Sequence, residues 1–248
     1  MMEWFKRWFG EEYLTVYEHR NAGEAEREVQ TIVSVLDIKK KELVLDLCCG
    51  NGRHDIPLVR KSCRVIGLDF SLPLLKIARN SGIPGQKYPL YICADARQLP
   101  FCNGIFDIVI NLFTSFGYFE DDENYQLLCS ISQLLKPDGR FYIDYLNPPH
   151  VLAGLVDESI KESDSVKIIE KRKFDRTTRR IEKEIILKKN NNLSIFHESV
   201  RLYELDEMTE MIENAGLSIR GVLGSVNGEP YSETSERMIL YGTKKAGE

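Results

Sequence analysis

The feature that most constrains the fold of this chain is an apolar run that ends in a glycine-containing turn. Residues 43–48 read Leu-Val-Leu-Asp-Leu-Cys, and Cys49-Gly50-Asn51-Gly52 follows directly. A short run that is apolar throughout is typical of a strand buried on both faces of a parallel sheet. Glycine adopts backbone angles that other residues avoid, and it lets a ligand approach the main chain. The pattern predicts a ligand-binding turn at the carboxyl end of a central strand, with a helix beginning beyond it.

The same kind of run recurs along the chain, with helical segments between the runs. Further strands are predicted at 64–69, 90–95, 106–111, 140–146, 217–223 and 237–243, and helices at 72–80, 121–135 and 206–214. Strands that alternate with helices favour a doubly wound α/β fold. We therefore expect a mostly parallel, seven-stranded sheet with helices on both faces.

The pattern changes after the fifth strand. Segments 166–174, 180–188 and 193–203 have strand character and are separated by polar turns, which predicts a small antiparallel insertion of about three strands. Its many basic residues are expected on a solvated face rather than at an RNA site. We expect one domain with four parts: a helical lid (1–40), a ligand-binding core (41–146), an antiparallel insertion that caps the substrate (147–203), and a closing helix and strands (204–248).

Composition excludes several classes of protein. The chain is 43% hydrophobic and 29% charged, as soluble globular proteins are, and its net charge of -5 gives no general attraction to nucleic acid or anionic lipid. No apolar run reaches the ~18 residues of a membrane span, and no signal-peptide core is present. The six cysteines lack the paired spacing of a zinc site. We expect a cytoplasmic protein with reduced thiols, no metal and no membrane partner.

The turn alone is compatible with several nucleotide ligands. The dinucleotide fingerprint needs a third glycine where Asp55 stands, and no Gly-Lys-Ser/Thr follows to make a P-loop. Two other acidic residues end predicted strands. Asp69 can accept both hydroxyls of a ribose, and Asp95, beside the main-chain N–H of Ala96, suits an adenine ring. The set indicates a nucleoside ligand without phosphates.

These residues, with the turn at 134–140, resemble the class I S-adenosylmethionine (SAM)-dependent methyltransferases over roughly residues 40–146 and the closing strands. The family's first motif is usually Asp-x-Gly-x-Gly-x-Gly, and here Cys48 stands in place of the first glycine. The resemblance implies that SAM is the cofactor and that a methyl group is transferred by in-line displacement. Alignment of the reactants supplies much of the acceleration of such a reaction, and a general base is needed only for a protonated acceptor.

The resemblance also implies roles for individual residues. Gly50 and Gly52 would admit the methionine moiety, while Asp46 would bond to nearby amides or, through water, to its amino group. Tyr118 and His150 follow the fourth and fifth strands, where acceptor contacts arise, and His150 is the candidate base. The full set expected at the cofactor is Asp46, Cys48, Gly50, Gly52, Asp69, Phe70, Asp95, Ala96, Asn111 and Leu112, joined by Tyr17 and Arg20 of the leading helices.

The acceptor is less constrained than the cofactor. A small molecule is the leading hypothesis, and RNA or protein is the alternative. Against RNA, the Asn147-Pro148-Pro149-His150 segment looks like the motif of base amino-methyltransferases but follows the fifth strand, not the fourth. A catalytically silent SAM-binding or interaction protein is a further alternative, and the antiparallel insertion is a candidate homodimer surface. An NAD-dependent oxidoreductase is disfavoured because the third glycine is missing.

Overall fold

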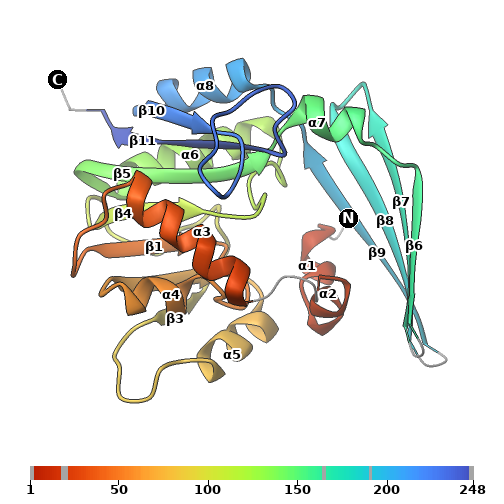
Figure 1. Cartoon of the computed structure of the whole chain (residues 1–248), viewed down its shortest axis with the longest axis horizontal. Coiled ribbons are helices and arrows are strands. Elements are labelled where there is room, and N and C mark those ends of the chain that lie inside the picture. The colour runs from red at the N-terminus through yellow and green to blue at the C-terminus, as the bar shows by residue number, and fades with distance from the viewer. Residues whose placement is uncertain (1–2, 18–21, 164–165, 190–191, 246–248) are drawn as a thin grey trace.

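The computed structural model describes residues 3–17, 22–163, 166–189 and 192–245, and its centre is a seven-stranded sheet (Figure 1). The strand order is β10-β11-β5-β4-β1-β2-β3, in which β1 to β5 are parallel and β11 runs antiparallel to both of its neighbours. This confirms the doubly wound fold. The strands are β1 (Leu43–Leu47), β2 (Arg64–Asp69), β3 (Leu90–Cys93), β4 (Phe106–Asn111), β5 (Leu135–Leu146), β10 (Leu217–Leu223) and β11 (Arg237–Lys244).

Helices cover both faces of this sheet because its strands are apolar on both sides. On one face, Val29 and Ile32 of α3 and Leu58 of α4 pack on β1 and β4. On the other face, α6 packs on β5 and α8 packs on β10, and both helices contribute to one apolar core with β1 and β4. The helices are α3 (Ala22–Val35), α4 (Asp55–Arg60), α5 (Leu72–Asn80), α6 (Asp121–Leu134) and α8 (Leu205–Asn214).

A second, antiparallel sheet follows the fifth strand, as expected, but it has four strands rather than about three. Its order is β6-β7-β8-β9, and the strand that was not predicted is β6 (Glu158–Ser163). That segment carries one apolar residue and lies at the sheet edge, so it lacks the alternation by which strands are recognised. The others are β7 (Val166–Asp175), β8 (Arg180–Lys189) and β9 (Asn192–Arg201), and α7 (Pro148–Ala153) links the two sheets.

One strand begins earlier than predicted. Residues 136–139 were expected to form a turn before the fifth strand, but Leu135 already pairs with Phe106 of β4. The register then jumps, because the next pair joins Ile108 to Arg140. Residues 136–139 therefore form an irregularity within β5 that interrupts its pairing with β4. Asp138 in this segment has a positive φ of 60°.

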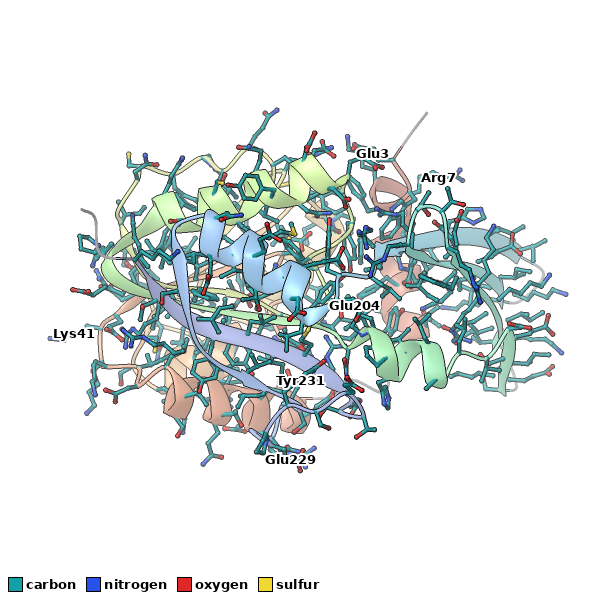
Figure 2. The ribbon with its side chains drawn as sticks, turned by 90° about the horizontal axis from the view of Figure 1, so that it is seen from above. Glu3, Arg7, Lys41, Glu204, Glu229 and Tyr231 are labelled. Atoms are coloured by element: carbon teal, nitrogen blue, oxygen red, sulfur yellow. The ribbon has the colours of Figure 1, made fainter. Side chains whose placement is uncertain are left out.

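Two short aromatic helices fill the space between the sheets, α1 (Phe5–Trp8) and α2 (Glu11–Val16) (Figure 2). Phe5 joins the core cluster of the large sheet, whereas Trp8 is fully buried against Ile168 and Ile185 of the antiparallel sheet. The indole Nε1 of Trp8 donates to Glu198 of β9 at 2.6 Å. The N-terminal segment thus attaches the antiparallel sheet to the core. In the described part of the chain, no helix has the length and apolar character needed to cross a membrane.

Candidate functional site

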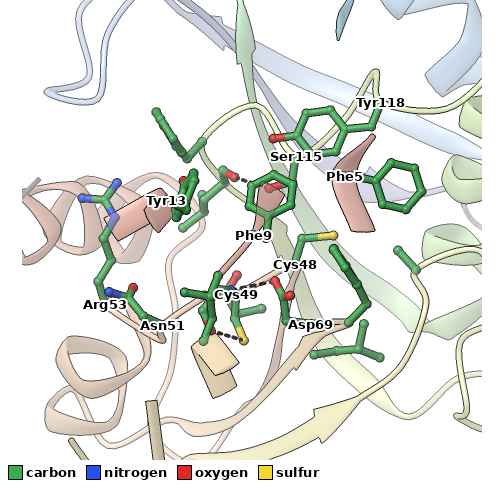
Figure 3. Close-up of a pocket in the computed structure, with 18 of the residues that line it drawn as sticks. Phe5, Phe9, Tyr13, Cys48, Cys49, Asn51, Arg53, Asp69, Ser115 and Tyr118 are labelled. Carbon is green, nitrogen blue, oxygen red and sulfur yellow. Dashed lines mark hydrogen bonds between the residues drawn. The ribbon is translucent and has the colours of Figure 1, made fainter. Parts of the chain in front are cut away.

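A cavity of about 350 Å³ lies at the carboxyl ends of β1, β2, β3 and β4, where open α/β sheets bind their ligands. In Figure 3, Phe9, Tyr13 and Tyr118 lie on one side of it, and Cys48, Cys49 and Asp69 lie on the other. Most residues that were expected at the cofactor line this cavity. They are Asp46, Cys48, Gly50, Asp69, Phe70, Asp95, Ala96, Leu112 and Tyr17.

The turn after β1 has the left-handed backbone that glycine favours. Gly50 has a φ of 56°, and Cys48 has a φ of 63°, which costs a residue with a side chain about 1–2 kcal/mol. This conformation gives a physical reason why glycine suits the position of Cys48. Two hydrogen bonds hold the turn in place: the amide of Cys49 donates to the carbonyl of Leu68 at 3.0 Å, and the amide of Gly50 donates to Oδ2 of Asp69 at 2.9 Å.

Gly52 lies behind the turn and does not line the cavity. Its φ is 70°, and a Cβ atom there would collide with the hydroxyl of Tyr91 and lie 3.0 Å from Oδ2 of Asp55. A glycine is therefore required for packing against β3 and α4. Its expected contact with the cofactor stays a prediction.

Two buried carboxylates, Asp46 and Asp55, stand together at the base of the turn. Burial raises the pKa of Asp55 to about 6, and burial together with the Asp55 carboxylate raises the pKa of Asp46. Oδ2 of Asp46 is buried without a hydrogen-bond partner among the described residues, although Asp46 lines the cavity. The raised pKa favours the neutral acid, and a cation beside Asp46 would stabilise its ionised form instead. The arrangement fits the positively charged amino and sulfonium groups of SAM.

The carboxylates expected at the ribose and the adenine are both held in place. Asp69 accepts hydrogen bonds from the amides of Gly50 and Ser71, the second at 2.7 Å. Asp95 pairs with Arg97 at 2.7 Å, and hydrogen bonds from Arg97 lower the pKa of Asp95. A carboxylate has lone pairs for about four hydrogen bonds, so both retain the capacity to accept ligand hydroxyl or amino groups.

The side chains of Asn111 and His150 do not line this cavity. The side chain of Asn111 is buried, with Nδ2 donating to the carbonyl of Leu47 at 2.9 Å and Oδ1 without a hydrogen-bond partner among the described residues. Its neighbour Leu112 lines the cavity in its place. Arg20 lies outside the described residues. His150 is exposed on α7 and lines a different cavity.

Several lining residues gave little signal in the sequence. Phe113 and Thr114 follow β4 with positive φ values of 57° and 58°, a conformation that nothing in their residue types predicts. The turn is held by Asp144 of β5, whose Oδ2 accepts from the amide of Phe113 at 2.9 Å. Strained backbone of this kind is concentrated at ligand sites. Phe9 lies between α1 and α2, and its residue type alone gave no signal that it would line the cavity.

The first cavity has a neighbour of about 590 Å³, between the loop after β4, α7 and the inner face of the antiparallel sheet. Four aromatic residues line both cavities: Tyr13, Tyr17, Phe113 and Tyr118. The polar residues of the second cavity are Thr114, His150, Ser159, Arg172, Lys183, Glu198 and Arg237.

A network of hydrogen bonds and ion pairs crosses the boundary between the cavities. Glu198 accepts from the hydroxyl of Tyr17 at 2.9 Å and pairs with Lys183 at 2.7 Å. Lys183 also donates to the Tyr17 hydroxyl at 2.6 Å. Burial and the Glu198 carboxylate raise the pKa of Tyr17, so its phenol stays protonated. Tyr17, at the end of α2, therefore lines the first cavity and is hydrogen-bonded to the antiparallel sheet that lines the second cavity.

Comparison with known proteins agrees with this geometry. The family model of a methyltransferase domain matches residues 44–139. The cypemycin N-terminal methyltransferase of a Streptomyces species is 30% identical over 203 residues, which cover 79% of this chain and 81% of that protein. This chain belongs to the class I SAM-dependent methyltransferases. It is an enzyme whose cofactor is SAM.

Two solved structures of methyltransferases share the fold at low identity. CcbJ of Streptomyces caelestis has a TM-score of 0.82 at 18% identity, covering 97% of this chain and 98% of its own. The SAM-bound amino pentose methyltransferase CalS10 of Micromonospora echinaspora has a TM-score of 0.66 at 19% identity, covering 94% and 96%. Because the coverage of CcbJ is nearly complete, its similarity extends beyond the matched 44–139 core.

Proposed function

We propose that this methyltransferase methylates an amino group of a small-molecule acceptor bound in the second cavity. The observation that carries the proposal is the wall of Tyr13, Tyr17, Phe113 and Tyr118 that the two cavities share. A cofactor in the first cavity and an acceptor in the second would meet at this wall. Transfer requires close approach of the two reacting atoms, and adjacent cavities supply it.

The cofactor supplies a methyl group on a positively charged sulfur. Methylation of an amine moves that positive charge to nitrogen: the nitrogen lone pair forms the new bond, and a proton then leaves to solvent. Aromatic faces stabilise cations at short range, and Tyr13, Phe113 and Tyr118 line the region in which the charge moves. A neutral amine is itself the nucleophile, so such a reaction needs no base in the transition state.

Two residues remain candidates for direct roles at the acceptor. Tyr118 is half-buried between the cavities, and desolvation raises the pKa of its phenol, so we infer that it acts as a hydrogen-bond donor. His150 lines the second cavity from α7 while staying exposed. We infer that it accepts a proton from an acceptor that arrives as an ammonium ion.

The comparisons support an amino acceptor through the names of the relatives. One is named for the methylation of a peptide N-terminus and another for an amino pentose, and both acceptors carry an amino group. The volume of the second cavity, about 590 Å³, lies within the range of small-molecule sites. RNA and protein acceptors remain the alternative to be tested.

The test is transfer of a deuterated methyl group from SAM, followed by mass spectrometry. Small amines, alcohols, thiols, tRNA and a protein mixture would each be offered to the purified chain. The proposal predicts labelled product from small amines alone. Ile181→Trp, which fills the second cavity, should abolish transfer and leave SAM affinity unchanged, while Leu152→Trp on the exposed face of α7 should alter neither.

Other outcomes contradict the proposal in different ways. Label in tRNA or protein alone would identify a macromolecular acceptor. Tight SAM binding with no transfer to any class would identify a silent SAM-binding protein. Full activity of Ile181→Trp would show that the acceptor binds elsewhere.

A further inference from the structure

The antiparallel sheet carries an apolar row on the face that points away from the core. Its inner face is buried by α1 and α2, through residues such as Ile168, Ile185 and Leu187. Side chains alternate along a strand, so the outer face of such a sheet is normally polar. Here one isoleucine from every strand lies on that outer face.

The strand register places these isoleucines directly opposite one another. Ile160 pairs with Ile169, Ile169 pairs with Ile186, and Ile186 pairs with Ile195, so that one unbroken row crosses the four strands. The two ends of the row are 53% and 45% exposed, at Ile160 and Ile195. None of the four belongs to a buried hydrophobic cluster of the described residues. A continuous exposed apolar row of this kind marks an interaction surface more often than an isolated exposed residue does.

We propose that the outer face of the antiparallel sheet binds a second copy of this chain, with the two isoleucine rows packed against each other. Two sheets that pack face to face keep their strands nearly aligned, with an angle of about 30° between them. A two-fold axis parallel to the strands meets that condition. It sets β6 of one copy opposite β9 of the other, and β7 opposite β8. Ile160 then meets Ile195, and Ile169 meets Ile186.

The charges beside the row select this arrangement. The next row reads Glu158, Lys171, Glu184 and His197 from β6 to β9. The strand-parallel axis reverses that order in the second copy, which sets Lys171 opposite Glu184 and Glu158 opposite His197. Both contacts pair a carboxylate with a basic side chain, and the two-fold symmetry forms each contact twice.

The row on the other side of the isoleucines adds one contact between like charges. There Lys167 meets Lys188, but Lys167 is already paired with Glu162 of its own chain at 2.8 Å. A two-fold axis along the isoleucine row is less favourable. It would set Glu158 against Glu162 and Lys171 against Lys167, which are contacts of like charge, and only Glu184 against Lys188 would be complementary. Opposed charges therefore favour one of the two face-to-face symmetries.

Sedimentation velocity on the whole chain tests the proposal. We expect the wild type at micromolar concentration to sediment with twice the 28.6 kDa mass of one chain. Ile195→Asp, at an exposed end of the row, and Ile186→Asp, at its centre, should each give monomers. The matched control is Leu152→Asp, at an apolar site on α7 that is 37% exposed, which should stay dimeric.

A charge exchange separates association from folding. Lys171→Glu should weaken the dimer at least tenfold, and Glu184→Lys should do the same. The double variant should restore the dimer, because both the contact between copies and the 3.9 Å pair within one chain are reformed with reversed charge. Exposed pairs contribute little to stability, so thermal unfolding should change little in any of the three variants. A monomeric wild type, or a dimer that survives both aspartate substitutions, would overturn the proposal.

Discussion

Arg180 of the antiparallel sheet donates a hydrogen bond of 2.8 Å to the carbonyl oxygen of Tyr118, the residue that stands between the two cavities. The same guanidinium donates to the carbonyl of Phe119 at 3.0 Å and to that of Gly117 at 3.2 Å. Arg180 is only 9% exposed. The insertion therefore does more than wall the second cavity, because its buried arginine fixes the path of the loop that carries Tyr118.

Replacement of this arginine should damage both stability and transfer. Arg180→Met removes a buried donor from three carbonyl groups of this loop, and we expect a loss of about 2–4 kcal/mol in the free energy of unfolding. Methyl transfer should fall at least tenfold as Tyr118 loses its position. Urea unfolding and the transfer assay measure the two effects. Arg179→Met is the matched control, because Arg179 is half-exposed and makes only surface ion pairs with Glu204 and Glu207. Equal stability of the two variants would contradict the role of Arg180.

The positive φ of Cys48 determines which substitutions the turn after β1 should tolerate. Cys48→Gly removes the strain of a left-handed residue, while glycine gains entropy in the unfolded chain, so stability should stay within about 1 kcal/mol of the wild type. SAM binding should persist. Cys48→Val, with a branched side chain that this conformation disfavours, should cost more than 2 kcal/mol on the scale of roughly 1–3 kcal/mol for strained residues. Cys63→Val, at a buried cysteine without a positive φ, should be tolerated better.

The buried Asp55 predicts how stability depends on pH. Its folded-state pKa is raised from 3.8 to about 6, so the folded protein holds this proton more tightly than the unfolded chain does. The stabilisation from this proton is complete below pH 4 and is lost as the pH rises through about 6. Asp55→Asn keeps the shape of the protonated acid. It should be more stable than the wild type at pH 8, by on the order of 1 kcal/mol, and should lose that advantage at pH 4.

Thermal unfolding across this pH range measures the effect of Asp55→Asn. Asp37→Asn serves as the control, since a hydrogen bond from Lys39 lowers the pKa of the exposed Asp37. Parallel pH profiles of the wild type and Asp55→Asn would contradict the assignment.

The parts of the fold that depend on local chemistry could be predicted from the sequence. The helix at 72–80 was predicted with the bounds that α5 has, because Ser71 caps it by accepting from the amide of Leu74 at 3.3 Å. The turn after β1 and the carboxylate of Asp69 were found for a similar reason. An apolar run followed by glycines constrains its own backbone, and the carboxyl ends of parallel strands meet at one edge of the sheet.

The parts of the fold and of the site that could not be predicted depend on contacts between segments far apart in the sequence. Arg180 belongs to a run of basic residues that was expected on a solvated face, and only the carbonyls of Gly117 to Phe119, about sixty positions earlier, bury it. His150 was expected in a loop after the fifth strand, but Pro148 and Pro149 begin α7, which carries it to the second cavity. Residue types alone could not reveal that Tyr17 would reach Glu198 of β9.

The placement of the cofactor is tested most directly by calorimetric titration with S-adenosylhomocysteine, the product form of SAM. Asp69 both lines the first cavity and holds the turn through Gly50, so Asp69→Ala should weaken binding at least tenfold, while Asp122→Ala on the exposed start of α6 should not. Circular dichroism would show that each variant is folded. We expect one binding event per chain in the wild type and its loss in Asp69→Ala. Absence of binding to the wild type, or affinity that Asp69→Ala leaves unchanged, would contradict it.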